Sequence, residues 1–523
     1  MLKAAHFLFI LSLTLFSFNE TKATPPTDTL VIVGNLDDIM SFDPAISSEL
    51  AANEILHNVY EQLVTYDPHN PEQFVGSIAD TWTMSPDGKT LTFTLKKGLT
   101  FASGNPITAE DVVYSLHRLI RINKVGADIF AQFGLTPENV TEKIVQTCPN
   151  SFEIRLDESF APTLLLNTLT HYSASILDKK LLAAHSENGD EGQQWLGQHA
   201  AGSGPFVLTS YVPQQRILLS RNPQRQQAPG TIKKVLFRNV QDQSTQELLL
   251  KKGDADIARD LKPEAMETLK DAYVFRIPTA RTRVLHLNQK VGPLAHPKVR
   301  EAIKHLIDYK GIEEKIAPGT LVTCQTFLPK GFPGAIDEKP FSYNPEKAKQ
   351  LLKEAGYEKG FEVTLSTIDN TTGQIFQDSF GKANIKVKVL LGDDKQVLTA
   401  LRSRQHEMAL AQWGADYYDP DANAMTFMRN PDNSDNTREK TLAWRNAWDI
   451  PEFTKIVNQA KREQDPHKRY ALYRDLQKQY LATSPAITMF QVHRIYTLHN
   501  RVQGLKAPAP MHMPQYAHVT KQS

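Results

Sequence analysis

The sequence predicts an α/β protein of several domains that is exported from the cytoplasm. Its 523 residues correspond to two to four domains at about 100–200 residues each. Strand and helix signals alternate irregularly along the chain, which is typical of mixed α/β proteins. Near its start the basic residue Lys3 precedes a short apolar run, the pattern of a secretory signal peptide.

The apolar run extends from Ala4 to Phe18, about fifteen residues, and is shorter than the ~20 residues that cross a bilayer. Thr21 and Ala23 stand where the −3 and −1 positions of a cleavage site fall, so we expect residues 1–23 to be removed. No Cys follows the run, and nothing therefore predicts a lipid anchor. The alternatives are an uncleaved anchor and a buried N-terminal helix.

Composition excludes several classes of protein. Hydrophobic residues make up 41% and charged residues 22%, which excludes a disordered chain, a collagen and a polytopic membrane protein. With 59 basic and 58 acidic residues, the net charge of +1 gives no electrostatic reason to bind nucleic acid or anionic lipid. The two cysteines, Cys148 and Cys324, are expected to be free or buried thiols, and they predict no zinc site.

Two strand signals come first along the chain. The apolar run Leu30 to Val33 suits a buried strand. Residues Trp82 to Lys96 predict a hairpin, because Pro86-Asp87-Gly88 supplies a turn before the alternating apolar residues Leu91, Phe93 and Leu95.

Three helix signals follow. Thr108 with Asp111 predicts a capped helix start. Pro297 is tolerated in a first turn and begins an apolar stripe at helical spacing. Asn344 is expected to cap a helix that stops at Gly356. Composition places candidate domain boundaries in residues 186–194, residues 221–230 and near Thr279–Arg283.

No enzyme motif is present. The sequence has no GxSxG, HExxH, P-loop or GxGxxG pattern, so we predict no catalytic residues, no metal and no cofactor. Met511-His512-Met513 is the one local trio of soft ligands, and we interpret it as a packed or flexible tail. These absences disfavour a secreted hydrolase, which is kept as the alternative of another class.

One segment combines aromatic and acidic side chains, Gln412-Trp-Gly-Ala-Asp-Tyr-Tyr-Asp-Pro-Asp-Ala-Asn423. Trp413, Tyr417 and Tyr418 beside Asp416 suit a cationic, partly apolar ligand, because a carboxylate pairs with an ammonium while rings bury the rest. The alternative is a structural turn in which Asp419 bonds its own backbone and the aromatic rings pack in the core. The residues alone leave both interpretations open.

The chain resembles the large periplasmic solute-binding proteins of peptide-type ABC importers, the oligopeptide-, dipeptide- and nickel-binding group. The resemblance covers nearly all of the chain after the signal peptide. It rests on seven stretches in the family's order: Ser41-Phe-Asp-Pro44, Tyr60-Glu-Gln-Leu63, the hairpin Trp82 to Gly98, Gly104 to Ser115, Gly202-Ser-Gly-Pro-Phe206, His296 to Ile303 and Tyr343 to Leu352.

The resemblance implies an α/β protein of two lobes with an extra small domain and a ligand in the interlobe cleft. By analogy, lobe I takes residues 24–66, 190–283 and 497–523. The small extra domain takes residues 67–189, and lobe II takes residues 284–496.

The resemblance also implies the residues of the site. Asp416 matches the aspartate that pairs with the ligand's α-ammonium group, and Gln412 and Gly414 would lend main-chain hydrogen bonds. Trp413 and Tyr417 of the aromatic group described above would lie beside it. The family's other edge contact falls at Ser48–Leu50, where Ser48 and Leu50 are the candidate ligand-binding residues. Dipeptide-binding relatives hold the ligand's carboxylate with an Arg, which the stretch Thr364 to Lys382 lacks.

The function implied is that of a periplasmic, monomeric binding protein. It would capture a short peptide or peptide-like amine and deliver it to an inner-membrane ABC permease, with no nucleic-acid partner. Because the carboxylate-binding Arg is missing, strict dipeptide recognition is not implied. The alternatives on the same fold are haem, a nickel chelate or an opine-like conjugate as ligand, and a signalling or chaperone role.

Overall fold

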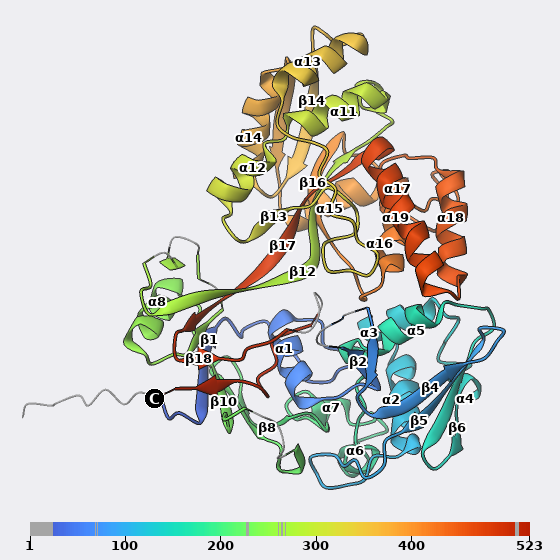
Figure 1. The fold of residues 1–523 in the computed structure, drawn as a ribbon, viewed down its shortest axis with the longest axis vertical. Coiled ribbons are helices and arrows are strands. Elements are labelled where there is room, and N and C mark those ends of the chain that lie inside the picture. Colours follow the sequence, from blue (N-terminus) through green and yellow to red (C-terminus); the bar gives the residue numbers. More distant parts are fainter. Residues whose placement is uncertain are drawn as a thin grey trace, which may run out of the picture.

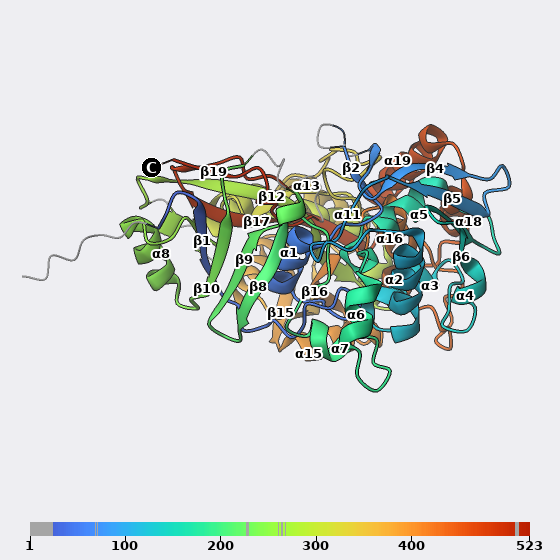
Figure 2. The same ribbon diagram turned by 90° about the horizontal axis from the view of Figure 1, so that it is seen from below.

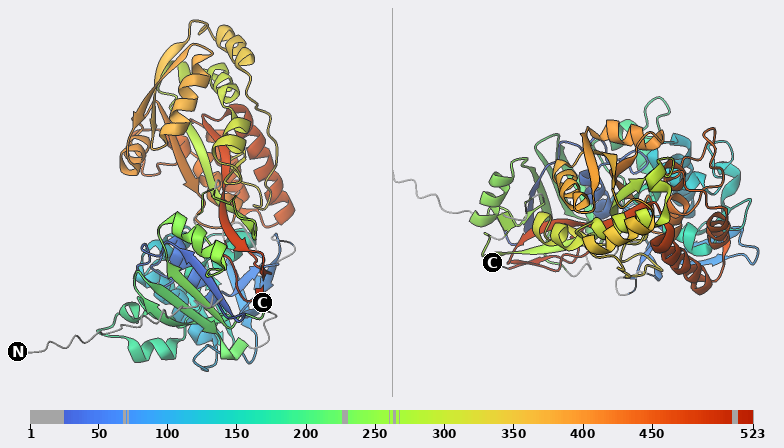
Figure 3. Two further views of the ribbon diagram at one scale, coloured as in Figure 1. Left: turned by 90° about the vertical axis from the view of Figure 1, so that its left-hand side faces the viewer. Right: turned by 90° about the horizontal axis from the view of Figure 1, so that it is seen from above.

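The computed structural model describes residues 25–67, 70, 72–225, 230–259, 261–262, 265–266, 268–507 and 512–522. The predicted signal peptide, residues 1–23, lies outside the described residues. Two lobes are stacked along the longest axis of the molecule, and two long strands run from one lobe into the other (Figure 1). The side view shows the same division, with the strands crossing between the lobes (Figure 3).

One sheet of eleven strands continues through both lobes. Its order is β15-β14-β16-β12-β17-β11-β1-β10-β9-β8, and β13 pairs with β17 off this path. The strands are β1 (Thr29–Gly34), β8 (Phe206–Val212), β9 (Arg216–Arg221), β10 (Lys234–Asn239), β11 (Ile257–Ala258), β12 (Ala272–Leu287), β13 (Leu321–Thr323), β14 (Phe361–Thr367), β15 (Ile385–Leu391), β16 (Met408–Gly414) and β17 (Ala486–His499). The predicted buried strand Leu30 to Val33 is confirmed as the interior of β1, each residue at most 4% exposed.

Strands β12 and β17 form the connection between the lobes. They pair antiparallel from Ala272 opposite His499 to His286 opposite Ala486, and the register shifts between Pro278 and Thr282. The candidate boundary near Thr279–Arg283 therefore lies inside a continuous strand, at its bulge. The division into lobes at 283/284 and 496/497, which cuts both strands, stays a prediction.

A second sheet, of four strands in the order β4-β5-β7-β6, lies beside the first lobe (Figure 2). Its strands are β4 (Ala79–Met84), β5 (Thr90–Leu95), β6 (Ile144–Cys148) and β7 (Ser151–Arg155). The predicted hairpin is confirmed as β4 and β5, and Leu91, Phe93 and Leu95 are at most 2% exposed. The short pairs are β2 (Val64–Tyr66) with β3 (Phe74–Gly76), and β18 (Val502–Gln503) with β19 (Thr520–Lys521).

The predicted helix starts are also confirmed. Thr108 and Asp111 form a capping box at α2, the second helix begins at Pro297 as α11, and the Asn344 side chain caps α13. The described α-helices are α1 (Leu50–Val59), α2 (Ala109–Ile122), α3 (Val125–Ala131), α4 (Val140–Lys143), α5 (Pro162–Leu169), α6 (Lys179–His185), α7 (Gln193–Leu196), α8 (Gln243–Lys252), α10 (Gly292–Ala295), α11 (Pro297–Leu306), α12 (Tyr309–Gly311), α13 (Pro345–Glu354), α14 (Asn370–Gly381), α15 (Asp394–Arg402), α16 (Pro420–Phe427), α17 (Leu442–Arg445), α18 (Pro451–Arg462) and α19 (Pro466–Thr483).

Three large apolar cores hold these layers. One fills the lobe around β1 and one the lobe around β14 and β16. The third joins the four-stranded sheet to α16, α18 and α19, so the small sheet and the second lobe share a core. No described helix is apolar enough over a sufficient length to cross a bilayer.

The early Ser41-Phe-Asp-Pro44 stretch anchors the small sheet's main helix. The carboxylate of Asp43 accepts two hydrogen bonds from Arg118 on α2, at 2.9 and 2.5 Å, and both side chains are 0% exposed. Such a bidentate pair fixes orientation as well as distance. The free thiols expected at Cys148 and Cys324 are confirmed, the first exposed and the second buried.

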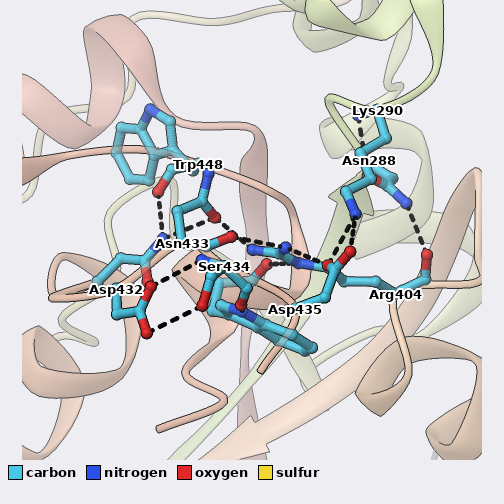
Figure 4. Close-up of polar contacts among 10 residues, drawn as sticks. Asn288, Lys290, Arg404, Asp432, Asn433, Ser434, Asp435 and Trp448 are labelled. Atoms are coloured by element: carbon cyan, nitrogen blue, oxygen red, sulfur yellow. Dashed lines mark hydrogen bonds and ion pairs between the residues drawn. The ribbon is translucent and has the colours of Figure 1, made fainter. Parts of the chain in front are cut away.

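A polar cluster around Arg404 fixes the chain where it enters β16 (Figure 4). Arg404 has the left-handed φ of 58°, and its carbonyl accepts a hydrogen bond from Asn288 at 3.1 Å. Its guanidinium donates to the backbone oxygen of Asn433 and to the carboxylate of Asp435, both at 3.0 Å. Because Arg404 lies four residues before β16, this cluster positions the strand that leads into the site.

Candidate ligand-binding cleft

A cavity of about 580 Å³ opens between the two lobes. One wall comes from α1 and the segment before it, a second from α3 and the end of α5, and a third from the chain that follows β16. The strands β12 and β17 contribute its inner end. The cavity is therefore an interlobe cleft lined by both lobes and by helices that lie beside the small sheet.

Strand β16 brings Asp416 to this cleft. The strand pairs with β12 along its whole length but with β14 only at Met408 and Ala409, so its edge from Leu410 to Gly414 is left open in the described sheet. Asp416 follows two residues beyond the strand and is exposed to the cleft. Among the described residues it has no ion-pair or hydrogen-bond partner.

The electrostatics of Asp416 favour a cationic guest. Burial in the cleft raises the pKa of its carboxyl, and the nearby carboxylate of Asp128 raises it further. Both effects disfavour the charged form when the cleft is empty. An ammonium group between the two carboxylates would reverse this, because an opposite charge stabilises the ionised form.

The turn after Asp416 is rigid. Asp419 caps α16, accepting a hydrogen bond from the backbone N–H of Asp421 at 2.8 Å. Its carboxylate also pairs with Arg469 through bonds of 2.8 and 2.7 Å, and it accepts from Asn167 on α5 at 2.7 Å. The structural interpretation of Asp419 is thus confirmed, and the turn holds Asp416 in place.

The aromatic side chains are divided between the core and the cleft wall. Tyr417 and Tyr418 line the cleft but are only 8% and 2% exposed. The hydroxyl of Tyr417 donates to Gln132 at 3.2 Å, and that of Tyr418 donates to the carbonyl of Gly331. The rings are therefore held by packing and expose little of their surface to a ligand.

The structure brings together most of the predicted site residues. Asp416, Gly414, Tyr417, Ser48 and Leu50 all line the cleft, and Leu50 is 39% exposed. The walls at Ser48–Leu50 and at Asp416 thus face one cavity although the sequence separates them widely.

Two predicted residues lie elsewhere. Gln412 and Trp413 line a second cavity of about 570 Å³, the side cavity, between β16, the end of β14 and α15. The indole of Trp413 also donates to Asn423 at 3.4 Å. Gly414 and Arg281 line both cavities, so the two cavities adjoin at the end of β16.

Several other residues that line the cleft were not predicted from the sequence. Arg281 and Arg494 come from the connecting strands, and Lys461 comes from α18. His512 and Met513, interpreted from sequence as part of a packed or flexible tail, also line it. Met511 lies outside the described residues.

Three histidines, His57, His171 and His512, share the wall near α1. The rings of His57 and His512 lie 5.3 Å apart between centroids. Burial lowers the pKa of His57 to about 4 and that of His171 to about 3, and it holds the pKa of His512 well below its ordinary value. These imidazoles are neutral at pH 7, and no group of three or more described His, Cys, Asp or Glu residues is arranged to hold a metal ion.

The protein should lose stability as the pH falls from about 6.5 towards about 4. In that range the unfolded chain binds protons at His57 and His171, whose ordinary pKa is about 6.5, while the folded chain does not. Thermal unfolding at several values between pH 7.5 and pH 4.5 measures the slope of stability against pH. His171→Asn should flatten it, whereas His467→Asn, at an exposed residue of α19, should not. An unchanged slope in the His171 variant would contradict this account.

The fold and the cleft define the class of two-lobed periplasmic binding proteins. The model of the bacterial extracellular solute-binding proteins, family 5, matches residues 73–435, more than half of the chain. The chain therefore belongs to the bacterial extracellular solute-binding proteins of family 5. This match confirms the family resemblance found in the sequence.

Curated relatives match over most of their length. The probable D,D-dipeptide-binding periplasmic protein of Escherichia coli (strain K12) is 28% identical over 504 residues, 93% of each chain. The dipeptide-binding protein of the same organism is 26% identical over 461 residues, covering 82% of this chain and 83% of its own.

Solved structures show the same fold. HbpA2 from Haemophilus parasuis has a TM-score of 0.80 at 22% identity, over 95% of this chain and all of its own. The unliganded open form of the periplasmic murein tripeptide binding protein MppA has a TM-score of 0.79 at 21% identity. The match covers 95% of this chain and 98% of the MppA chain. The predicted α/β fold of two lobes is thereby confirmed.

Proposed function

We propose that the protein is the periplasmic receptor of an ABC importer, and that it binds a short peptide or a peptide-like amine for delivery to an inner-membrane permease. The observation that carries this proposal is Asp416, a carboxylate without a protein partner among the described residues, at the open end of β16 in the interlobe cleft. An ammonium group supplies the missing charge.

The family and its named relatives support the same ligand class. The two E. coli relatives are named for dipeptides and for D,D-dipeptides. The open edge of β16 suits a peptide main chain, since an extended peptide adds to a free strand edge through backbone hydrogen bonds. Export by a cleaved signal peptide, a monomeric state and partnership with a permease complete the proposal.

The proposal is tested by native mass spectrometry on protein purified from the periplasm. The measurement is then repeated after denaturation. A mass excess that is lost on unfolding and corresponds to peptides supports the proposal. A coloured protein or a bound metal would instead identify haem or a nickel chelate as the cargo. N-terminal sequencing of the same sample should begin at Thr24, and an intact Met1 would contradict cleavage.

Ligand binding should also close the lobes. A ligand that contacts both walls of the cleft stabilises the closed arrangement and shifts the population towards it. Small-angle scattering should therefore show a smaller radius of gyration after addition of the peptide that mass spectrometry identifies.

A further inference from the structure

The cleft holds three cations that recognition of an amine leaves unexplained, two arginines and Lys461, and Lys461 lies over the ring of Phe160. Arg281 on β12 and Arg494 on β17 both line it. Neither forms an ion pair with any residue in the described part of the chain. The guanidinium of Arg494 donates to the sulfur of Met513 at 2.6 Å, and a thioether is only a weak acceptor. By contrast, Arg283, two residues along β12, is paired with Asp369 at 2.7 Å.

A β-bulge sets the direction of Arg281. The register of β12 against β17 shifts between Pro278 and Thr282, so Arg281 lies within the irregularity. The hydroxyl of Thr279 holds the bulge, donating to the carbonyl of Val492 at 2.6 Å and accepting from the backbone N–H of Arg281 at 3.1 Å. Bulges beside binding sites re-aim side chains in this way.

The residue opposite Arg281 makes room for its side chain. In the pairing of β12 with β16, Arg281 stands opposite Gly414. A Cβ atom on Gly414 would lie 3.3 Å from Cγ of Arg281, a tight contact. The stem of Arg281 therefore lies across the bare backbone of Gly414, two residues before Asp416.

The two guanidiniums act on each other. Burial lowers the pKa of Arg281, and the charge of Arg494 lowers it further. Two like charges that share a partly dry cavity repel, and an anion between them removes the repulsion. Planar guanidiniums bind carboxylates through paired hydrogen bonds, which makes a carboxylate the matching anion.

We propose that Arg281 and Arg494 bind the carboxylate of a zwitterionic ligand, a short peptide with a free C-terminus whose ammonium group is held by Asp416. This inference rests on the proposed function and names its substrate class.

Arg281 and Arg494 would bind the carboxylate in place of the Arg that the sequence lacks between Thr364 and Lys382. In the structure that stretch reaches the side cavity at Thr367 and Asp369. Asp369 is itself engaged by Arg283 and by the hydroxyl of Thr372, at 2.7 and 2.8 Å. The two arginines that line the cleft without an ion pair are on the connecting strands instead.

The test compares peptides that differ only in their terminal charges. Ala-Ala, Ala-Ala-Ala and D-Ala-D-Ala, each in free, C-amidated and N-acetylated form, are titrated into the full-length mature protein by calorimetry. C-amidation should weaken binding to the wild type by roughly 30-fold or more. Arg281→Gln and Arg494→Gln should each weaken binding of the free peptide while leaving binding of the amide nearly unchanged.

The control is Arg283→Gln, a neighbouring arginine that is already paired and faces the side cavity. It should keep the full preference for the free acid. Binding of the amide also shows that each variant is folded. Equal binding of acid and amide by the wild type, or a preference that survives in both Gln variants, would overturn the inference.

The same panel separates this inference from the proposed function. If N-acetylation abolishes binding while C-amidation has no effect, the proposed function stands and the carboxylate site is overturned. If no peptide binds in any form, both fail. Loss of the preference in Arg283→Gln alone would move the carboxylate to the side cavity and also overturn the inference.

Discussion

Replacing Asp416 by Asn should weaken binding of an amine-bearing peptide by roughly 30-fold to several-thousand-fold. Removing one charge of a desolvated pair costs about 2–5 kcal/mol, much of it from the charge left without a partner. Here the ligand's ammonium would remain in the cleft without its carboxylate. Calorimetric titration of the variant with the peptide identified by mass spectrometry measures the loss.

Asp128→Asn is the matched control, because Asp128 is exposed in the same cleft and its carboxylate acts on Asp416 from a distance. We expect a loss well below that of Asp416→Asn. An N-acetylated peptide should bind the wild type and Asp416→Asn equally poorly. Unchanged affinity in Asp416→Asn would remove this residue from the site.

Replacing Arg469 by Met should destabilise the protein by about 3–5 kcal/mol. Arg469 and Asp419 are both 0% exposed, so the substitution leaves a carboxylate buried without its cation. The bond from Asn167 to Asp419 remains, but it cannot neutralise the charge. Denaturant unfolding followed by circular dichroism measures the change.

Arg462→Met supplies the comparison for this prediction. Its ion pair with Glu158 links α18 to the chain after β7, and the two side chains are 58% and 62% exposed. Exposed pairs contribute about 0–1 kcal/mol, so this variant should be nearly as stable as the wild type. Adding Asp419→Asn to Arg469→Met should recover part of the loss. Equal stability of the two single variants would contradict the role of burial.

Local signals in the sequence were enough to predict individual elements. The hairpin before Leu95, the capped start at Thr108 and the proline-led helix at Pro297 each depend on residues within one or two turns of chain. The interactions that form these elements are made between residues close in sequence, which is the range that a sequence pattern covers. The structure places each element where the pattern does.

The cleft could be predicted only in part. Asp416 and its neighbours form one contiguous segment, so their chemistry was visible in the sequence. Arg281 and Arg494 lie more than 200 positions apart, and only the pairing of β12 with β17 brings them to one cavity. The side chains of Tyr417 and Tyr418 are shared between wall and core, a division that residue type alone does not reveal.

The bulge near Thr279 shows a different limit. Its composition marked a candidate boundary between domains, yet the backbone there continues as a strand. A small polar residue serves a linker and a bulge equally well, because both interrupt regular pairing. Only the pairing of this segment with β17 shows that it is a bulge in a strand and not a linker.

The central position of β17 bears on the order in which the chain can fold. The first strand, β1, pairs with β11, which in turn pairs with β17 at Thr497 and Leu498. The last residues then pack on α1, where Asn58 donates to the carbonyl of Pro514 at 2.8 Å. Neither lobe is complete until residues 486–521 have been synthesised. A nascent chain therefore cannot complete its main sheet before β17 has been made.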